Sequence, residues 1–254
     1  MYILNIPEYV KIIIFAVLFV LHWYGSIITH SGYLHRYLTH AQFIMSVRMQ
    51  KTVHFLYWLF NGSCYLSPVT YAKMHTLHHL YPDTEIDPHS PRYHKKPLKF
   101  LWRTWTEFNK THQGGYDKEL AGYEFKHWDA LDRIADRREV RILWAILYAA
   151  IYWILVPYWF MIPFYIVTIL MGPIHGFIVN WFAHKVGYKN FDDGNDSRNV
   201  FKHDWLLVGE LLHNNHHHNK GSYTFAIEDN NEVDPLGNLL LWLAKKNIVT
   251  LPSY

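Results

Sequence analysis

Histidine is the residue type that offers this chain most chemistry. The 254 residues include 19 histidines and only one cysteine, Cys64. Neutral imidazole is a common ligand of iron, zinc and copper, whereas a cysteine-based zinc site would need several thiolates. The histidines are internal and clustered, and they do not form a terminal run like an expression tag. Their spacing therefore indicates whether they could bind metal.

Three histidine clusters have spacings that suit metal ligation. Two are H-x-x-H-H triplets, whose offsets of three and four residues place the imidazoles within about 100° of arc on one helix face. The other is an H-x-x-x-x-H pair. Five residues correspond to about 140° on an ideal helix, so this pair converges only if the helix ends or bends. The clusters are His35 and His40; His75, His78 and His79; and His213, His216 and His217. Asn180 and His184 form a further pair, one helical turn apart.

Two long stretches of the chain contain no charged side chain. Residues 12–35 are long enough to cross a bilayer, which takes about 20 apolar residues. No small-residue cleavage site follows them, which favours a retained span over a signal peptide. Residues 142–183 are twice as long as one span needs, and Pro157 and Pro163 lie near their middle. Because proline breaks helices, this stretch predicts two spans joined by a hairpin.

These stretches predict an all-α integral membrane protein with a single domain over residues 1–254. Arg141 and Lys185 flank the second stretch, and the positive-inside rule makes their side cytoplasmic. We expect about three transmembrane helices, with interfacial helices such as residues 53–66 and a cytoplasmic helical cap that carries the histidines. The expected spans are residues 11–34, 142–161 and 163–184, and the expected cytoplasmic segments are residues 35–141 and 185–254.

An even number of spans between the first and last clusters places every cluster on the same membrane face. All nine cluster and pair histidines can then meet at one site, and nine imidazoles exceed what one ion can take. The sequence therefore predicts two metal ions. The clusters contain few carboxylates, unlike bundle di-iron sites built on Glu-x-x-His. Imidazole also accepts zinc, so the type of ligand alone does not identify the metal.

The order of these boxes resembles that of the integral membrane fatty acid desaturases of the acyl-CoA type. The likeness extends to the acidic D-P-H stretch of residues 83–92, to N-x-x-x-H at residues 180–184, and to G-E-L-L at residues 209–212. It covers about residues 20–220. One departure is that the family usually has two spans before the first box, whereas this chain has room for one. That would place the N-terminus outside if the boxes face the cytoplasm.

The resemblance implies two iron ions, for which zinc could substitute in a structure, and O₂ as co-substrate. The implied ligands are His35, His40, His75, His78, His79, His184, His213, His216 and His217, with Asn180 bound through a water. The substrate would be a fatty acyl chain, as a CoA thioester or bound in a lipid. With no haem domain or cysteine cluster in the chain, electrons would come from a separate donor: a ferredoxin, a rubredoxin, or a b-type cytochrome with its reductase. The expected location is a bacterial inner membrane or an ER-type membrane, among membrane lipids, with the site on the cytoplasmic face.

Other polar residues have supporting roles in this interpretation. Asp83, Asp87 and Glu210 are candidates to orient ligand imidazoles by accepting their free N–H. We expect His22, His30 and His175 to find local hydrogen bonds within the spans. We expect surface or packing roles for His54, His94, His112, His127 and His203. His218 adjoins the third box but lies outside its pattern, so its role is left open.

Two other functions fit parts of the sequence. A membrane hydroxylase acting on lipid or alkane would use a similar site, but the five-residue first box and the D-P-H stretch resemble desaturases more closely. A metal transporter would place ionisable ligands along a path near the middle of the membrane, whereas these clusters lie at span ends. The formal charge of +3 is too small to suggest a nucleic-acid partner.

Overall fold

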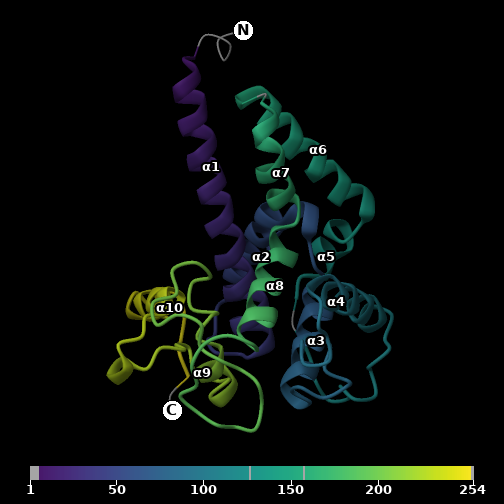
Figure 1. Cartoon of the computed structure of the whole chain (residues 1–254), viewed down its shortest axis with the longest axis vertical. Helices are drawn as coiled ribbons and strands as arrows, with labels where there is room; N and C mark the ends of the chain where they lie inside the picture. The colour runs from purple at the N-terminus through teal and green to yellow at the C-terminus, as the bar shows by residue number, and fades with distance from the viewer. Residues whose placement is uncertain (1–5, 126, 157, 253–254) are drawn as a thin grey trace.

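The computed structural model describes residues 6–125, 127–156 and 158–252, and over these ranges the chain is helical (Figure 1). The β-structure within them consists of isolated bridges, such as the one between Ile44 and Thr250. The expected all-α class is therefore confirmed for the described residues.

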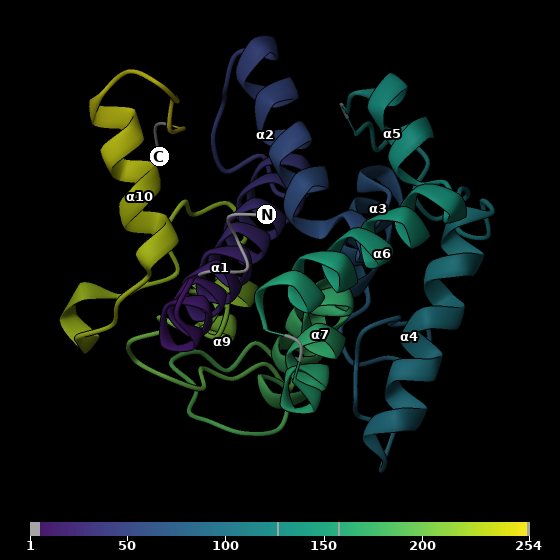
Figure 2. The same ribbon diagram turned by 90° about the horizontal axis from the view of Figure 1, so that it is seen from above.

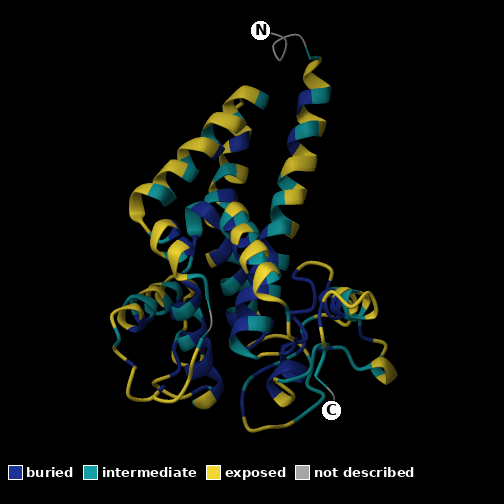
Figure 3. Cartoon of the chain, turned by 180° about the vertical axis from the view of Figure 1, so that it is seen from behind, coloured by how far each residue is buried: buried dark blue, intermediate teal, exposed yellow. Residues whose placement is uncertain are grey.

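The first helix is long enough to cross a membrane. α1 (Glu8–Thr29) continues without a break into a π-helix (His30–Thr39), and the combined helix passes the length and hydropathy requirements of a span. Side chains such as Ile13 and Leu21 are more than half exposed on its upper part. Figure 3 shows the same mixture of exposed and half-buried surface on the upper helices, while buried residues gather at the lower end. Exposed apolar side chains of this kind suit contact with lipid.

The remaining helices surround the lower end of α1. They are α2 (Val47–Asn61) with a 3-10 turn (Gly62–Cys64), α3 (Pro68–Leu80), α4 (Pro97–His112), α5 (Asp129–Ala135), α6 (Arg138–Leu155), a 3-10 turn (Trp159–Met161), α7 (Ile162–Ile169), α8 (Met171–Phe177) with a π-helix (Ile178–Phe182), α9 (His213–His218), a 3-10 turn (Glu228–Asn230) and α10 (Pro235–Lys245). Seen from above, α10 and α4 lie on opposite sides of α1 (Figure 2). Helix α2, within which we expected an interfacial or buried segment, buries Tyr57 and exposes Phe55.

The expected span over residues 163–184 is not one continuous helix. α7 and α8 meet at Leu170 with a bend of 71° between their axes. Pro173 accounts for the bend, because its ring lacks an N–H and clashes with the carbonyl of the residue four positions earlier, Ile169. Pro163 instead lies in the first turn of α7, where proline is well tolerated. Pro157, which we expected at the reversal, lies outside the described residues.

The count of three crossings stays a prediction. Among the described residues, one helix meets the requirements of a span, or two if the bent pair from Trp159 to Phe182 is one span. Helix α6 replaces the expected span of residues 142–161, but it begins at Arg138 and its first turn carries charged residues.

The lower end of α1 is anchored to the C-terminal part of the chain by an apolar cluster. Ile27 packs with Leu207, Leu211 and Leu236, all nearly inaccessible to solvent. Burying a side chain of this size contributes about 1.5–3 kcal/mol. The cluster therefore holds the segment before α9 against the end of α1.

A buried ion pair closes the same junction. Arg36 is fully buried, and its guanidinium donates to both carboxylate oxygens of Asp234, at 2.8 and 3.1 Å. Asp234 also caps α10 by accepting from the N–H of Gly237. Gly209, with φ of +110°, lies so close to Asp234 that a Cβ there would clash. The C-terminal segment is thus fixed to the first histidine box.

Replacing Asp234 with alanine should strongly destabilise the protein. The change removes a helix cap and leaves the Arg36 charge buried with one carboxylate partner fewer, and breaking such a pair costs about 3–5 kcal/mol. We expect the thermal midpoint in detergent to fall by several degrees in Asp234→Ala. The exposed Asp229→Ala should leave it unchanged. Equal midpoints for both variants and the wild type would contradict this account.

Candidate metal centre

The π-helix explains how the first histidine pair converges. In a π-helix each N–H bonds to the carbonyl five residues earlier, so residues five apart lie near one another. The N–H of His40 donates to the carbonyl of His35 at 3.1 Å, and the centroids of the two rings are 4.9 Å apart. We expected the helix to end or bend here. It instead changes to π-helical winding and ends at Thr39, with His40 as its C-cap.

Each histidine triplet divides its ligands between two centres. On α3, the Nε2 atoms of His75 and His79 are 3.0 Å apart, while Nε2 of His78 lies 3.1 Å from Nε2 of His217 on α9. On α9, Nε2 of His216 lies 2.9 Å from Nε2 of His79. Each helix therefore gives two imidazoles to one group and one to the other. Neither group can form from one helix alone.

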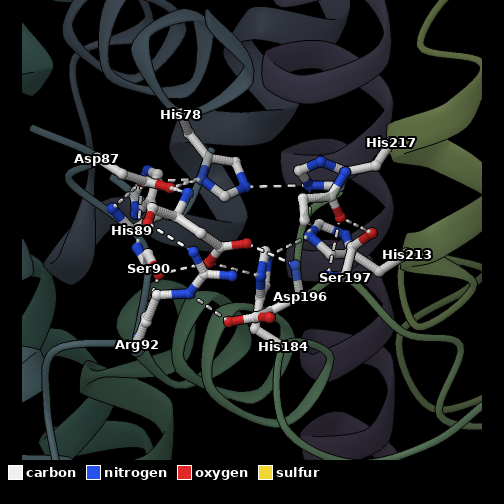
Figure 4. A network of polar contacts seen from close by, with 12 residues as sticks. His78, Asp87, His89, Ser90, Arg92, His184, Asp196, Ser197, His213 and His217 are labelled. Carbon is white, nitrogen blue, oxygen red and sulfur yellow. Dashed lines mark hydrogen bonds and ion pairs between the residues drawn. The ribbon is translucent and has the colours of Figure 1, made fainter. Parts of the chain in front are cut away.

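The structure brings all nine predicted histidines together, in two groups. Within each group the candidate ligand atoms lie within 4.8 Å of one another. The first group is His35, His40, His75, His79 and His216, and the second is His78, His184, His213 and His217. Figure 4 shows the four imidazoles of the second group, which come from α3, α9 and the turn after the second π-helix, pointing toward one another.

Three carboxylates lie against the outer nitrogens of these imidazoles, at the positions expected from the sequence. Oε2 of Glu210 lies 2.6 Å from Nδ1 of His35, and both oxygens of Asp87 lie 2.9 Å from Nδ1 of His78. Oδ1 of Asp83 is 3.4 Å from Nδ1 of His184. A carboxylate accepts the proton on Nδ1, which leaves the Nε2 lone pair free to face the group.

The distances between Nε2 atoms fit bound metal ions. An ion with bonds of about 2.1 Å at right angles separates neighbouring nitrogens by about 3.0 Å. Adjacent Nε2 atoms in the two groups are 2.9–3.1 Å apart, including the pairs His35–His216 and His184–His213. Nitrogens whose lone pairs face one another at this distance repel unless a cation lies between them. The residues present therefore fit two ions.

Burial favours the neutral, metal-binding form of several of the grouped imidazoles. Burial, followed by the charges of neighbouring histidines, lowers the pKa values of His75, His79 and His216 well below the ordinary value. Protons therefore do not compete with a metal ion for these nitrogens at neutral pH.

The loop after α3 is built around Asp87. Its carboxylate accepts the backbone N–H groups of Asp83, His89 and Ser90 in addition to the proton of His78. Burial raises the pKa of Asp87, but His78 and the backbone donors outweigh this effect and lower it overall. Asp87 is therefore ionised and accepts from His78. Figure 4 shows this loop beside the second group.

The sequence did not point to Arg36 as part of the site. Its guanidinium contacts Oε1 of Glu210 at 3.3 Å, and it lies 3.9 Å from the centroid of the Phe225 ring. Ser31 also donates to Glu210. Glu210 thus has positive and polar partners on one side and His35 on the other. An arginine inside a histidine box was the available signal, but its partner Asp234 is 198 residues away.

Two asparagines of the third box fix α9 to the preceding loop, and the sequence analysis had missed them. Asn214 accepts from the N–H groups of Asn190 and Phe191. The amide of Asn215 donates to Glu232 at 2.7 Å and accepts from Asn199 at 2.8 Å. Because both side chains point away from the metal groups, they hold the helix that presents the ligands.

A cavity of about 190 Å³ adjoins the two groups. His35, His75 and His213 contribute to its wall, and so does Asn180. Most of the remaining lining is apolar and aromatic, from α1, α3, α4 and α8. Such a space, beside a candidate metal centre and lined mostly by apolar groups, suits an apolar ligand.

Of the three histidines that we expected to form local hydrogen bonds, two differ from that expectation. His22 does find a local partner, with Nε2 2.7 Å from the carbonyl oxygen of Phe60. Neither ring nitrogen of His175 has a hydrogen-bond partner, and Nδ1 of His30 has none either. Our expectation is wrong for these atoms. Both side chains line the cavity, where apolar neighbours offer no hydrogen bond. His218 is exposed and stacks on Phe191, outside both groups.

The histidines with expected packing or surface roles lie outside both groups. His54 is buried and its Nε2 lies 2.7 Å from the Tyr65 hydroxyl, so it packs in the interior. His203 is exposed and contacts the carbonyl of Asn231. The other three are partly or largely exposed: His94, His112 and His127.

Comparison with known proteins gives the family. The family model described as fatty acid desaturase matches residues 11–224. Among similar proteins are Delta-9 desaturase-like 4 protein of Arabidopsis thaliana, 29% identical over 72% of this chain, Acyl-CoA 5-desaturase AL21 of Anemone leveillei, 25% identical over 76%, and sn-1 stearoyl-lipid 9-desaturase of Anabaena variabilis, 26% identical over 72%. The matched part covers 58%, 58% and 63% of those proteins, respectively. Since the family model covers most of the chain, including all nine grouped histidines, the protein belongs to the fatty acid desaturase family.

Proposed function

We propose that this protein is a membrane fatty acyl desaturase, an oxidoreductase that places a double bond in a saturated acyl chain. The observation that carries the proposal is the apolar cavity beside two groups of buried imidazoles, in a chain of the desaturase family. The balanced reaction converts R–CH₂–CH₂–R′, O₂, two electrons and two protons into R–CH=CH–R′ and two molecules of water. The substrate is a fatty acyl chain carried as a CoA thioester or in a lipid.

The first group of five histidines would hold one iron ion and the second group of four the other. Asn180, on the second π-helix, would complete the second set through a water. Removing hydrogen from an unactivated methylene needs a strong oxidant, and the iron pair with O₂ supplies that chemistry when bound. Zinc fits the same nitrogen donors and could replace iron in an isolated protein.

The protein's own groups orient the ligands and shape the site. Asp87 accepts the Nδ1 proton of His78, and Glu210 and Asp83 lie beside Nδ1 of His35 and of His184. Carboxylates in these positions favour one tautomer and one ring orientation of the imidazoles. Arg36 balances the charge of Glu210. The aromatic lining of the cavity, which includes Phe100 and Trp105, excludes water from the acyl chain.

The partners and location follow from the same proposal. The chain contains one cysteine, so it cannot itself bind a cysteine-ligated cluster, and electrons would come from a ferredoxin, a rubredoxin or a b-type cytochrome with its reductase. The protein would lie in a bacterial inner membrane or an ER-type membrane. The ligand helices would face the cytoplasm, and α1 and the helices after α5 would supply the crossings.

Expression in a host that lacks its own desaturase tests the activity. Wild-type protein should generate new unsaturated acyl chains, detected by fatty acid profiling. His78→Ala should abolish them because it removes an imidazole of the second group. His203→Ala, which changes an exposed histidine, should match the wild type. Iron-loaded wild type that forms only alcohols would favour a hydroxylase, and wild type that forms neither product would contradict the proposal.

Metal analysis of the purified protein tests the ligand assignment independently of turnover. Two ions should bind per wild-type chain. Asp87→Asn should weaken retention of metal by about 10–100-fold, because the amide no longer accepts the Nδ1 proton of His78 as strongly. Asp193→Asn, in an exposed contact with His218, serves as the matched control. Full retention by Asp87→Asn during competition with a chelator would show that this carboxylate does not support a ligand.

A further inference from the structure

The cavity beside the metal groups is mostly apolar, but its wall also contains polar groups that an alkyl chain does not match. Three buried histidines outside both groups contribute to its wall: His30, His89 and His175. They come from the start of the first π-helix, from the loop after α3 and from α8. None shares with the others a set of ligand atoms close enough to hold an ion in the described part of the chain. Their role is therefore separate from that of the nine.

Some ring nitrogens of these histidines lack partners, namely Nδ1 of His30, Nδ1 of His89 and both nitrogens of His175. His175 is 1% exposed, and neither of its nitrogens is hydrogen-bonded. Its ring packs edge-on against Trp23, with 4.5 Å between centroids. His30 packs edge-on against Tyr71 at 4.9 Å, and its Nδ1 has no partner. These aromatic contacts fix the rings in place but satisfy neither a donor nor an acceptor of the imidazole.

A chain made only of methylenes would leave these groups unsatisfied. Neutral imidazole offers one N–H donor and one acceptor nitrogen, and burying either without a partner is unfavourable. The cavity wall also contains polar side chains such as Ser31 and Thr104, but none of them pairs with Nδ1 of His30 or with either nitrogen of His175. An oxygen atom on the ligand could accept from one imidazole, and a hydroxyl could also donate to another.

We propose that the cavity recognises an acyl chain through an oxygen function held between His30 and His175. This inference rests on the proposed function, and it adds that the enzyme selects its substrate by a hydrogen bond inside the cavity. The oxygen is either a hydroxyl on the chain or the chain's own ester or thioester carbonyl. In the second case the new double bond forms near the carboxyl end, because the carbonyl lies next to the metal groups.

Binding measurements separate these sources. The probes are octadecanoyl-CoA, its thioether analogue without the carbonyl oxygen, and a series of octadecanoyl-CoA isomers with one internal hydroxyl. Dissociation constants are measured on purified, metal-loaded wild-type protein in detergent. If a hydroxyl is recognised, at least one isomer should bind tenfold or more tightly than octadecanoyl-CoA. If the carbonyl is recognised, the thioether should bind at least tenfold more weakly than the thioester.

Variants of the cavity histidines identify the recognising groups. His175→Phe and His30→Phe should each reduce the preference for the oxygen-bearing ligand, over the ligand that lacks this oxygen, to less than threefold. His175→Gln keeps a donor and an acceptor and should retain part of this preference. His203→Phe makes the same change at an exposed site and should leave the preference intact. Metal content of each variant is measured in parallel, because unchanged occupancy shows that the fold is preserved.

Equal binding of the thioester, the thioether and every hydroxyl isomer by wild-type protein would overturn the inference. So would a preference that survives in both phenylalanine variants. Because binding is measured without turnover, these outcomes do not depend on desaturation. Conversely, a protein that shows the preference but forms no alkene would contradict the proposed function and leave the binding inference standing.

Discussion

Nine clustered imidazoles, eight of them buried and His40 half-buried, are the constraint on which the rest of this structure depends, because neighbouring inner nitrogens approach one another to 2.9–3.1 Å. Two lone pairs that face one another at that distance repel, and burial, by lowering the pKa values of His75, His79 and His216, keeps these imidazoles neutral. Two cations would turn each repulsive group into a set of bonds. Glu210, Asp87 and Asp83 fit the same arrangement, because each lies against the outer nitrogen of an imidazole, where a carboxylate favours a proton and leaves the inner nitrogen free. Metal binding and the folding of this end of the molecule are therefore coupled.

Because α3 and α9 each contribute histidines to both metal groups, the two groups form together. His78 on α3 belongs with the imidazoles of α9, and His216 on α9 belongs with those of α3. The first centre consequently needs the π-helix that continues α1, together with α3 and α9, and the second needs α3, α9 and the turn after the second π-helix. The apolar cluster around Ile27 and Leu211 and the ion pair of Arg36 with Asp234 hold these elements together. Asp234 lies beyond the residues that the family model matches, so the C-terminal segment of this chain also supports the site.

Local patterns in the sequence predicted much of the site. Offsets of three and four residues fix the geometry of a helix face, so the two triplets could be recognised directly. The division of each triplet between two centres could not, because it depends on how α3 and α9 pack. The convergence of His35 and His40 needs a π-helix, and no periodicity in the sequence distinguishes that from a helix end. Arg36 and Asp234 are far apart in the chain, so no local pattern relates them.

The helices outside the site were predicted less well. The absence of charge over residues 142–183 indicated apolar helices, but charge alone does not show where a helix bends. Pro173 carried the signal for the bend at Leu170, by its clash with the preceding turn. Similarly, His175 was expected to have a local partner because buried polar groups usually do. The reason it lacks one is that it faces the cavity, whose wall comes from parts of the chain that lie far apart in the sequence.

Diffraction at the iron absorption edge, from crystals of the iron-loaded protein, tests the central claim most directly. Our account predicts two anomalous peaks per chain. One should lie at bonding distance, about 2.1 Å, from the inner nitrogens of His35, His40, His75, His79 and His216, and the other from those of His78, His184, His213 and His217. A single peak, or peaks bound by other side chains while these imidazoles remain without metal, would contradict it.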